Sequence, residues 1–393
     1  MDIHRLRSET PGCAHRVHLN NAGASLAPDP VLERIRAHLD LESRVGGYEA
    51  EAEAAPAIEE SYRHMAALLG TEARNVAFTE HATASFVQAL SAVPFEPGDV
   101  ILTTRHDYVS NQIQYISLGK RMGVEVVRAP DAPEGGVDVQ ALADLVRTRR
   151  PRLVAMTHIP TNSGLVQDVA AVGRVCREHE VLFLVDACQS LGQMPVRPGE
   201  IGCHFLSATA RKFLRGPRGA GVLWVSDDVL EGGMEPLFPD LRSADWVAPD
   251  RYVPAATARR FETWEFAWAL VLGTGEAARY AGEVGLEAIR TRVSGMAADL
   301  RERLAGLPGV RVLDRGPELC AIVTAQVRGW RPPDLVMELR RRGINTTGQS
   351  RVDAVIDYDA KESDGALRIS PHYFNTDDEI AAVVGALAEL TGE

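Results

Sequence analysis

Long apolar runs are absent from this chain of 393 residues. No segment approaches the roughly 20 consecutive apolar residues that a membrane-spanning helix needs. Charged residues and Pro11 interrupt the N-terminal segment Met1–Val17, so it lacks the apolar core of a signal peptide. We therefore expect a cytoplasmic protein without a membrane partner.

Cysteine and positive charge are also scarce. The five cysteines are scattered and form no C-x-x-C pair, which argues against a disulfide framework and against a zinc site, so no metal is expected. The net charge of −12 argues against nucleic acid as a partner. The 45% of hydrophobic and 24% of charged residues are typical of a folded globular protein.

Lysine is unusually rare. Only three of the 42 basic residues are lysines, namely Lys120, Lys212 and Lys361. Because arginine supplies most of the positive surface charge, a lysine in an unusual setting is informative.

Between residues 75 and 225, short β-branched runs alternate with segments of helical periodicity. Strands that are apolar on both faces and alternate with helices indicate a mainly parallel sheet covered on two sides. Ligands bind such sheets beyond the carboxyl ends of the strands. Seven strands are expected, at residues 75–79, 99–104, 125–128, 152–156, 181–185, 205–207 and 221–225.

The chain is long enough for two domains of unequal size. Segment 246–254, which contains two prolines, marks a change of character. We expect a large α/β domain over residues 15–255 and a smaller α+β domain over residues 256–393, joined by the N-terminal arm 1–14. Within the smaller domain we expect a long helix at 266–304, strands near 310–313 and 321–325, and helices at 333–342 and 377–390.

Reactive groups directly follow two of the expected strands. Asp186 ends an apolar strand in Val185–Gln189 (VDACQ), where a carboxylate is costly unless something pairs with it. Lys212 lies beside Arg211 in Ser207–Gly219 (SATARKFLRGPRG). Crowded cations lower the pKa of a lysine, and a neutral amine is what a Schiff-base nucleophile requires.

Two neighbouring features suit a phosphate. Thr209 and Arg211 offer a hydroxyl and a guanidinium group. Thr79–Ser85 (TEHATAS) joins a strand to a helix, and the free N–H groups of a helix N-terminus bind anions. Together these groups predict pyridoxal 5′-phosphate (PLP), with its aldehyde on Lys212 and its ring nitrogen facing Asp186, where a carboxylate keeps the ring an electron acceptor.

On these segments the chain resembles the fold-type I PLP enzymes of the class V aminotransferase and cysteine desulfurase group. The resemblance runs from His18–Gly23 (HLNNAG) to Arg368–Thr376 (RISPHYFNT). It implies an α/β fold whose large domain holds a mainly parallel seven-stranded sheet sandwiched by helices, plus a smaller C-terminal α+β domain. It also implies a homodimer with active sites at the interface and a small amino-acid-like substrate.

The resemblance assigns roles to individual residues. Lys212 matches the lysine that forms the Schiff base, Asp186 the partner of the ring nitrogen, and Gln189 the residue that bonds the ring hydroxyl. Tyr108 matches the aromatic side chain stacked on the ring, and Arg368 the arginine that binds a substrate α-carboxylate. The other implied cofactor contacts are Ala82, Thr83, Thr209, Arg211, either Thr161 or Asn162, and Thr263 (or Glu265) across the dimer interface, while Asn21, Arg44 and Tyr48 are expected around the substrate.

One departure from the desulfurases bears on the reaction. Those enzymes carry a nucleophilic cysteine on a loop that precedes the carboxylate-binding arginine. Here the corresponding stretch, Gly343–Val352 (GINTTGQSRV), has none, so persulfide formation on that loop is excluded. Arg211 also stands where desulfurases usually carry histidine.

A finer resemblance suggests the chemistry. Val45–Ala50 (VGGYEA), Ser207–Gly219 and Leu367–Thr376 are similar to the C–S lyase of ergothioneine biosynthesis and to related lyases of natural-product thiol conjugates. This predicts β-elimination from a cysteine S-conjugate or its sulfoxide, which yields pyruvate and ammonia. An aminotransferase, a decarboxylating deaminase or an epimerase on the same scaffold stays open, as does a non-catalytic binding subunit.

Overall fold

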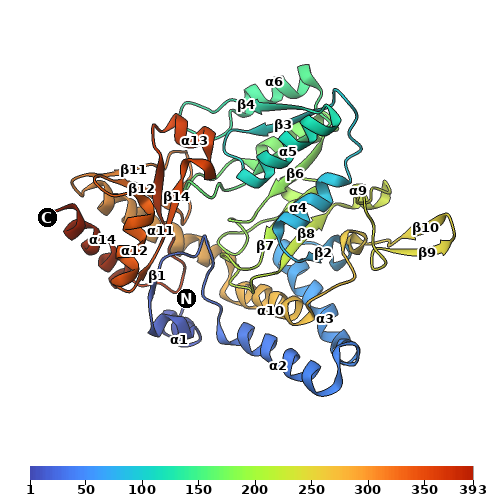
Figure 1. Cartoon of the computed structure of the whole chain (residues 1–393), viewed down its shortest axis with the longest axis horizontal. Coiled ribbons are helices and arrows are strands. Elements are labelled where there is room, and N and C mark those ends of the chain that lie inside the picture. The colour runs from blue at the N-terminus through green and yellow to red at the C-terminus, as the bar shows by residue number, and fades with distance from the viewer. Residues whose placement is uncertain (393) are drawn as a thin grey trace.

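The computed structural model describes residues 1–392 and has a seven-stranded sheet at its centre (Figure 1). Within this sheet β8 runs in the direction opposite to the other six strands. This confirms the predicted α/β class with a mainly parallel seven-stranded sheet. In spatial order the strands are β2 (Val76–Thr79), β8 (Gly221–Val225), β7 (Phe205–Thr209), β6 (Leu182–Asp186), β5 (Leu153–Thr157), β3 (Val100–Thr104) and β4 (Glu125–Ala129).

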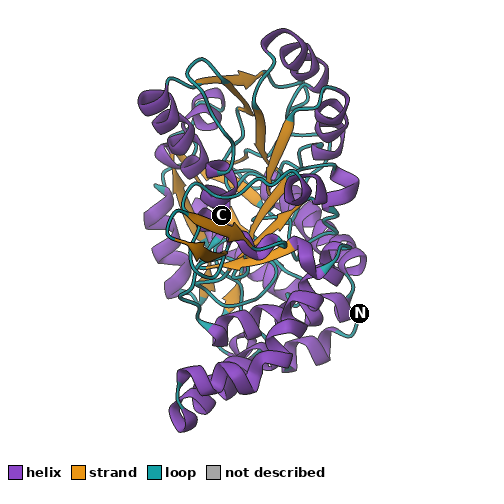
Figure 2. Cartoon of the chain, turned by 90° about the vertical axis from the view of Figure 1, so that its right-hand side faces the viewer, coloured by secondary structure: helices purple, strands orange, loops and turns teal. Residues whose placement is uncertain are grey.

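Helices cover both faces of this sheet (Figure 2). Successive residues of a strand point to opposite faces, and in β6 Phe183 and Leu184 are both fully buried although they belong to different apolar clusters. The central strands are therefore apolar on both faces, as their sequences predict. The helices between the strands are α4 (Ala82–Ser91), α5 (Val109–Met122), α6 (Val139–Arg149), α7 (Val169–Glu178), α8 (Pro198–Ile201) and α9 (Asp227–Glu231), with a 3-10 turn η2 (Ala73–Asn75) before β2.

Three long helices pack together beside the large sheet. They are α2 (Asp29–Val45), α3 (Gly47–Leu69) and α10 (Trp268–Val284). Gly275 of α10 is in close contact with α3, since a Cβ atom there would lie 2.5 Å from Ser61 Cα.

The C-terminal part forms a smaller α+β unit with its own apolar core. A four-stranded antiparallel sheet has the order β11 (Val310–Val312), β12 (Val323–Val327), β15 (Gly365–Ile369) and β14 (Thr347–Ser350). This confirms the predicted α+β character. Its helices are α11 (Leu286–Ala305), α12 (Pro332–Arg341), α13 (Val355–Ala360) and α14 (Asp377–Thr391), with a 3-10 turn η4 (Arg351–Asp353).

The N-terminal segment lies against this smaller unit. After α1 (Ile3–Ser8) and the turn η1 (Pro11–Ala14), strand β1 (Val17–His18) pairs in parallel with β13 (Ile344–Asn345). The division at residues 255 and 256 stays a prediction. Two contacts cross this division. Strand β1 precedes residue 255 but pairs with the C-terminal unit, and α10 follows residue 256 but packs on α2 and α3.

Two predicted elements differ in the structure. The helix expected over 266–304 is two helices, because Gly285 adopts a φ of 89° between α10 and α11, a conformation that glycine adopts without strain. The proline-containing segment 246–254 belongs to a projecting antiparallel hairpin of β9 (Ala244–Ala248) and β10 (Arg251–Pro254), followed by the turn η3 (Ala258–Phe261) (Figure 1).

Within residues 1–392, the structure contains no helix that is both apolar enough and long enough to cross a bilayer. In the same residues, no group of three or more His, Cys, Asp or Glu side chains is arranged to hold a metal ion.

The close approach of α10 to α3 gives a stability prediction. Gly275→Ala should destabilise the protein by about 1–3 kcal/mol, because the added methyl group overlaps backbone and side-chain atoms of Ser61. Gly282→Ala, in the same helix, has nothing within 4 Å and should stabilise it by about 0.5–1 kcal/mol through helix propensity. Chemical denaturation of both variants measures the difference. Equal stability of the two would contradict the proposed packing.

Candidate active site

The carboxyl ends of the central strands surround a cavity. Asp186 and Thr209 are the last residues of β6 and β7, and α4 begins just after β2. Nine of the fifteen residues predicted for the site line this cavity, namely Ala82, Thr83, Tyr108, Thr161, Asp186, Gln189, Thr209, Arg211 and Lys212.

Lys212 lies buried on one side of the cavity. Its Nζ atom is 6.0 Å from the centroid of the Tyr108 ring. Burial lowers the pKa of the Lys212 ammonium group, Arg211 and Arg368 lower it further, and the nearby Cys188 and Asp186 oppose the shift. A lysine in this setting more readily supplies the neutral amine that attacks an aldehyde.

The turn after Lys212 is held by a buried arginine. Arg215 has a φ of 64° and donates to Leu26 O at 2.8 Å, Thr10 Oγ1 at 2.6 Å and Tyr373 Oη at 2.6 Å. The N-terminal and C-terminal segments thus meet at this turn and fix the backbone that carries the lysine.

Asp186 faces the same cavity and is 4% exposed. Its Oδ1 accepts a hydrogen bond from Cys188 N at 2.9 Å, and its Oδ2 accepts one from Asn111 Nδ2 at 3.1 Å. Among the described residues no ion pair joins Asp186 to Lys212. The two groups are therefore buried on one cavity without neutralising each other directly.

The third side of the cavity is the N-terminus of α4. His81 caps this helix, since its Nδ1 accepts from Ala84 N at 3.0 Å. The N–H groups of Ala82 and Thr83 have no protein partner within residues 1–392. Gly221 of β8 allows this approach, because a Cβ atom there would lie 2.4 Å from the His81 carbonyl carbon. Free amides at a helix N-terminus form an anion site.

These groups fit the predicted PLP. The amine of Lys212 matches the aldehyde, Asp186 the ring nitrogen, and the α4 N-terminus with Arg211 the phosphate. A buried polar atom of the cavity lining, Gln189 Oε1, also has no hydrogen-bond partner within residues 1–392, so the cavity offers a further contact to a polar ligand.

Arg368 reaches the cavity through Thr161. Its guanidinium group donates to Thr161 O at 2.9 Å and to Thr161 Oγ1 at 2.6 Å, while Nε has no partner. Burial, with Arg211 adding to the effect, lowers the pKa of Arg368 to about 10. Of the two alternatives left by the sequence, Thr161 lines the cavity, whereas Asn162 Nδ2 donates to Asp357 Oδ2 at 2.5 Å and points away from it.

A buried ionic cluster lies where the two halves of the chain meet. Asp357 of α13 pairs with Lys361 at 2.6 Å and with His106 at 3.3 Å, and His106 also lies 3.4 Å from Asp131. Although burial acts in the opposite direction, Asp131 and Asp357 raise the pKa of His106 to about 9. The charged cluster holds α13 against the loop that carries Tyr108.

Four other predicted residues do not reach the cavity within one chain. Thr263 donates to Glu80 Oε1 at 2.9 Å. Asn21 Nδ2 donates to Ser370 O at 2.8 Å, and Asn21 Oδ1 accepts from Ser25 Oγ at 2.6 Å. Arg44 and Tyr48 lie at the exposed turn between α2 and α3, with Tyr48 73% exposed. Their assignment stays a prediction that requires a second subunit or a rearrangement.

The cavity also contains residues that the sequence interpretation missed: His81, Thr157, Ile159 and Cys188. Cys188 stands inside the VDACQ segment, so its position next to Asp186 was available as a signal. Burial and the Asp186 charge raise the pKa of its thiol well above the usual range. Burial also raises the pKa of Cys320 to about 12. Neither thiol is activated as a nucleophile.

Comparison with known proteins agrees with this geometry. The model of the family described as Aminotransferase class-V matches residues 17–383. A probable cysteine desulfurase of Methanothermobacter thermautotrophicus is 27% identical over 98% of both chains. A probable hercynylcysteine sulfoxide lyase of Mycobacterium tuberculosis is 29% identical over 98% of this chain and 93% of its own. The apo structure of the cysteine desulfurase of Thermococcus onnurineus NA1 has a TM-score of 0.90 at 24% identity, covering 99% of this chain and 98% of that one.

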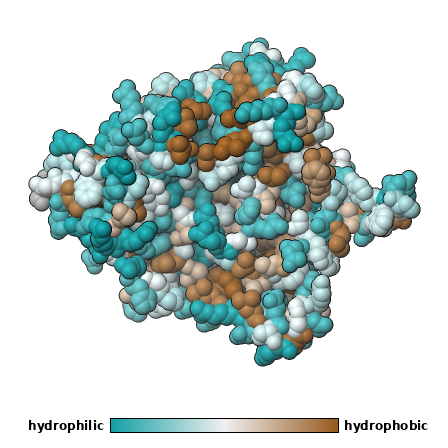
Figure 3. Space-filling model, viewed as in Figure 1, coloured by the Kyte–Doolittle hydropathy of each residue, from teal (hydrophilic) through white to brown (hydrophobic). Residues whose placement is uncertain are grey.

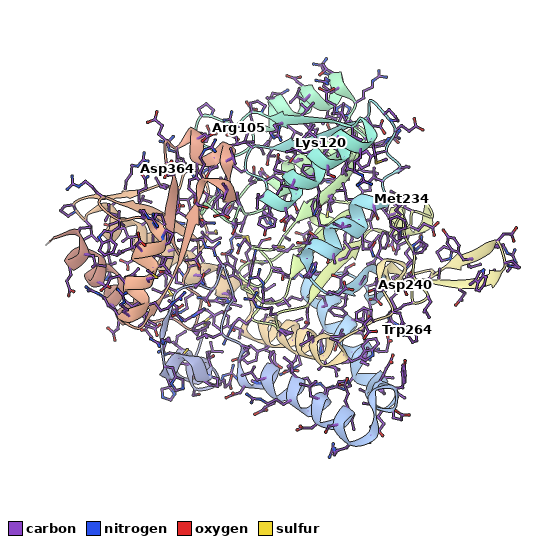
Figure 4. The ribbon with its side chains drawn as sticks, in the orientation of Figure 1. Arg105, Lys120, Met234, Asp240, Trp264 and Asp364 are labelled. Atoms are coloured by element: carbon purple, nitrogen blue, oxygen red, sulfur yellow. The ribbon has the colours of Figure 1, made fainter. Side chains whose placement is uncertain are left out.

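The rarity of lysine makes the covalent site directly testable. After addition of PLP and reduction with borohydride, peptide mass mapping should find the stable adduct on Lys212. Lys120 is exposed on α5 (Figure 4), and Lys361 is held by Asp357. Lys212→Arg should abolish the specific adduct, and Lys120→Arg should leave it unchanged. A main adduct on either of the other lysines would contradict the assignment.

Proposed function

Because the chain belongs to the aminotransferase class-V family, we propose that it is a PLP-dependent C–S lyase acting on a cysteine S-conjugate or its sulfoxide. The observation that carries this proposal is the content of the cavity. It holds a buried lysine opposite a buried carboxylate, and its one cysteine, Cys188, is kept protonated. Such a site can move a proton at Cα but has no thiolate to accept sulfur.

The residues that would hold the cofactor come from the ends of three strands, β2, β6 and β7. Lys212 binds the aldehyde, Asp186 the ring nitrogen, and Ala82 and Thr83 the phosphate through their free N–H groups, with Arg211 adding charge. Bound PLP supplies a ring that accepts the electrons released when a bond to Cα breaks.

The protein's own contribution to the reaction is proton transfer and orientation. Lys212 Nζ accepts the Cα proton, and its lowered pKa brings it closer to the pH range in which a base is effective. The Cβ–S bond breaks, and its electron pair leaves with sulfur as a thiolate or sulfenate. Water then hydrolyses the remaining three-carbon unit to pyruvate and ammonia.

Arg368 is proposed to bind the substrate α-carboxylate. It is buried, one end of its guanidinium group is fixed by Thr161, and Nε remains without a partner. Arginine binds carboxylates with two parallel hydrogen bonds, so a carboxylate can occupy the free side of the group. This would orient the Cα–H bond towards Lys212.

A homodimer is part of the proposal, and the β9–β10 hairpin supports it. The two strands pair only with each other, and an isolated two-stranded hairpin is marginally stable in water. Trp246 on the hairpin is 80% exposed, and Phe238 just before it is 79% exposed. Exposed aromatic side chains on a projecting hairpin are typical of a protein interface.

The interface would also complete the site. Trp264 and Asp240 lie near the base of the hairpin (Figure 4). The residue before Trp264, Thr263, donates a hydrogen bond to Glu80, just before the N-terminus of α4. The space-filling view in Figure 3 shows the hairpin projecting from the body of the molecule, where a second copy can contact it. We propose that Thr263, Arg44 and Tyr48 act in the partner subunit's site.

The reaction is tested with a panel of S-substituted cysteines and their sulfoxides. The purified protein loaded with PLP should release pyruvate and ammonia in equal amounts, without a keto-acid acceptor. Lys212→Ala should lower turnover at least about 100-fold, because a positioned general base contributes that much. Arg368→Ala should lower kcat/KM roughly 10–100-fold, as expected for loss of a charged hydrogen-bonded contact.

The control for this assay is the fate of the cofactor. Stoichiometric conversion to pyridoxamine phosphate, with activity that depends on a keto acid, would overturn the lyase proposal in favour of an aminotransferase. Release of CO₂ or of the opposite enantiomer would identify a decarboxylase or an epimerase. A protein that takes up no PLP would favour the non-catalytic binding subunit.

The dimer is tested by replacing the exposed aromatic side chains on and just before the β9–β10 hairpin. Phe238→Asp combined with Trp246→Asp should shift the protein to a monomer in analytical ultracentrifugation and lower its activity. Met337→Asp, on the exposed face of α12, is the matched control and should leave both unchanged. A wild-type protein that sediments as a monomer would rule out the proposed interface.

A further inference from the structure

We propose that Asp107 and Asn111 form a buried relay behind Asp186, in which Asn111 is a positioning residue for the carboxylate that faces the cofactor ring. The inference rests on the proposed PLP site and adds residues that none of the motifs assigned. It concerns how the protein keeps Asp186 oriented in a buried setting.

The relay is defined by one amide group between two carboxylates. Asn111 lies in the first turn of α5 and is 3% exposed. Its Nδ2 atom donates to Asp186 Oδ2 at 3.1 Å and to Asp107 Oδ1 at 3.1 Å. The two amide hydrogens therefore serve one carboxylate each, and the position of Asp186 is tied to that of Asp107.

Asp107 is itself buried and is held by uncharged donors. Its carboxylate accepts from Thr103 Oγ1 at 2.7 Å and Thr157 Oγ1 at 2.6 Å, and from Tyr115 Oη at 3.0 Å. Within residues 1–392 no lysine, arginine or histidine forms an ion pair with it. A buried carboxylate without a cation is costly, and burial raises the pKa of Asp107.

The same carboxylate also positions the aromatic side chain of the cavity. Asp107 Oδ1 accepts from Tyr108 N at 2.7 Å, and Thr157 Oγ1 lies 3.1 Å from the same N–H group. Tyr108 is the N-cap residue of α5, and its ring lines the cavity with its centroid 6.0 Å from Lys212 Nζ. Asp107 thus positions two groups that would contact the PLP ring: Asp186 at the ring nitrogen, through Asn111, and Tyr108 on the ring face.

The two carboxyl groups also favour one sign of charge on the ligand. With both carboxyl groups ionised, the cavity wall at Asp186 is more negative than a single aspartate would make it, and this like-charge pair is costly unless a cation offsets it. A cationic group on the ligand side, such as a protonated ring nitrogen, offsets that charge. The relay therefore favours a ligand that carries positive charge at this point, and it holds Asp186 in the rotamer that meets it.

The test compares three variants in the PLP-loaded protein. Asn111→Leu keeps the size of the side chain and removes the bridge. Asp107→Asn keeps the size and removes the charge. Tyr115→Phe removes one donor to Asp107 and leaves the bridge intact, so it is the matched control.

Two of these variants should behave alike. Asn111→Leu and Asp107→Asn should bind PLP about 10–100-fold more weakly in spectroscopic titration of the apo protein, the range typical of lost orienting contacts. Both should also shift the visible absorption band of the bound cofactor, and lower kcat with little change in KM. Tyr115→Phe should change each of these less than about threefold, and thermal melting of the apo proteins checks that all three are folded.

The outcomes separate the relay from the proposed function. If the wild type forms the Lys212 adduct but Asn111→Leu and Asp107→Asn match it in PLP affinity and spectrum, the relay is overturned and the proposed function stands. If the wild type takes up no PLP, both are overturned. If Asn111→Leu fails to fold, Asp107→Asn alone decides, because it keeps the size of the side chain while it removes the charge and one of the two acceptor oxygens.

Discussion

Lys212 and Asp186 are buried on one cavity without touching each other, and the rest of the site depends on this arrangement. Taking a carboxylate and an amine out of water is costly unless each finds a partner. Asp186 accepts hydrogen bonds from the uncharged Cys188 N and Asn111 Nδ2, no ion pair joins it to Lys212 within residues 1–392, and both groups line the cavity. A ligand with an aldehyde at one end of a ring and a protonatable nitrogen at the other offsets both costs at once. The parallel sheet makes this possible, because it brings the ends of β6 and β7 to the same edge.

The smaller C-terminal unit completes that site from the other side. Arg368 of β15 holds Thr161 beside the cavity, and Asp357 of α13 binds Asn162 and His106 from the large-domain loops. These contacts join distant parts of the sequence, so the C-terminal unit fixes the loops that carry Thr161 and Tyr108 beside the cavity. With its pKa raised to about 9, His106 is protonated near neutral pH, and its ion pairs then contribute to the docking.

Much of this could be predicted from local sequence. The β-branched runs gave the seven strands because burial on both faces leaves a continuous apolar pattern, and Asp186 and Lys212 were identifiable because each follows such a run directly. The choice between Thr161 and Asn162 could not be predicted, since it depends on the direction in which each loop side chain points. The role of Asp107 could not be predicted, because its hydrogen-bond partners come from β3, β5 and α5. Asp186, which it meets through Asn111, ends β6, and the order of β3, β5 and β6 in the sheet cannot be read from the sequence. The break at Gly285 was missed because a single glycine is tolerated inside a helical pattern.

The most direct measurement is a high-resolution crystal structure of the protein grown with PLP. The account predicts continuous density between Lys212 Nζ and the aldehyde carbon, with the ring nitrogen within hydrogen-bond distance of Asp186 and the phosphate at the α4 N-terminus. Density for the cofactor at another lysine, or with its ring nitrogen turned away from Asp186, would contradict it.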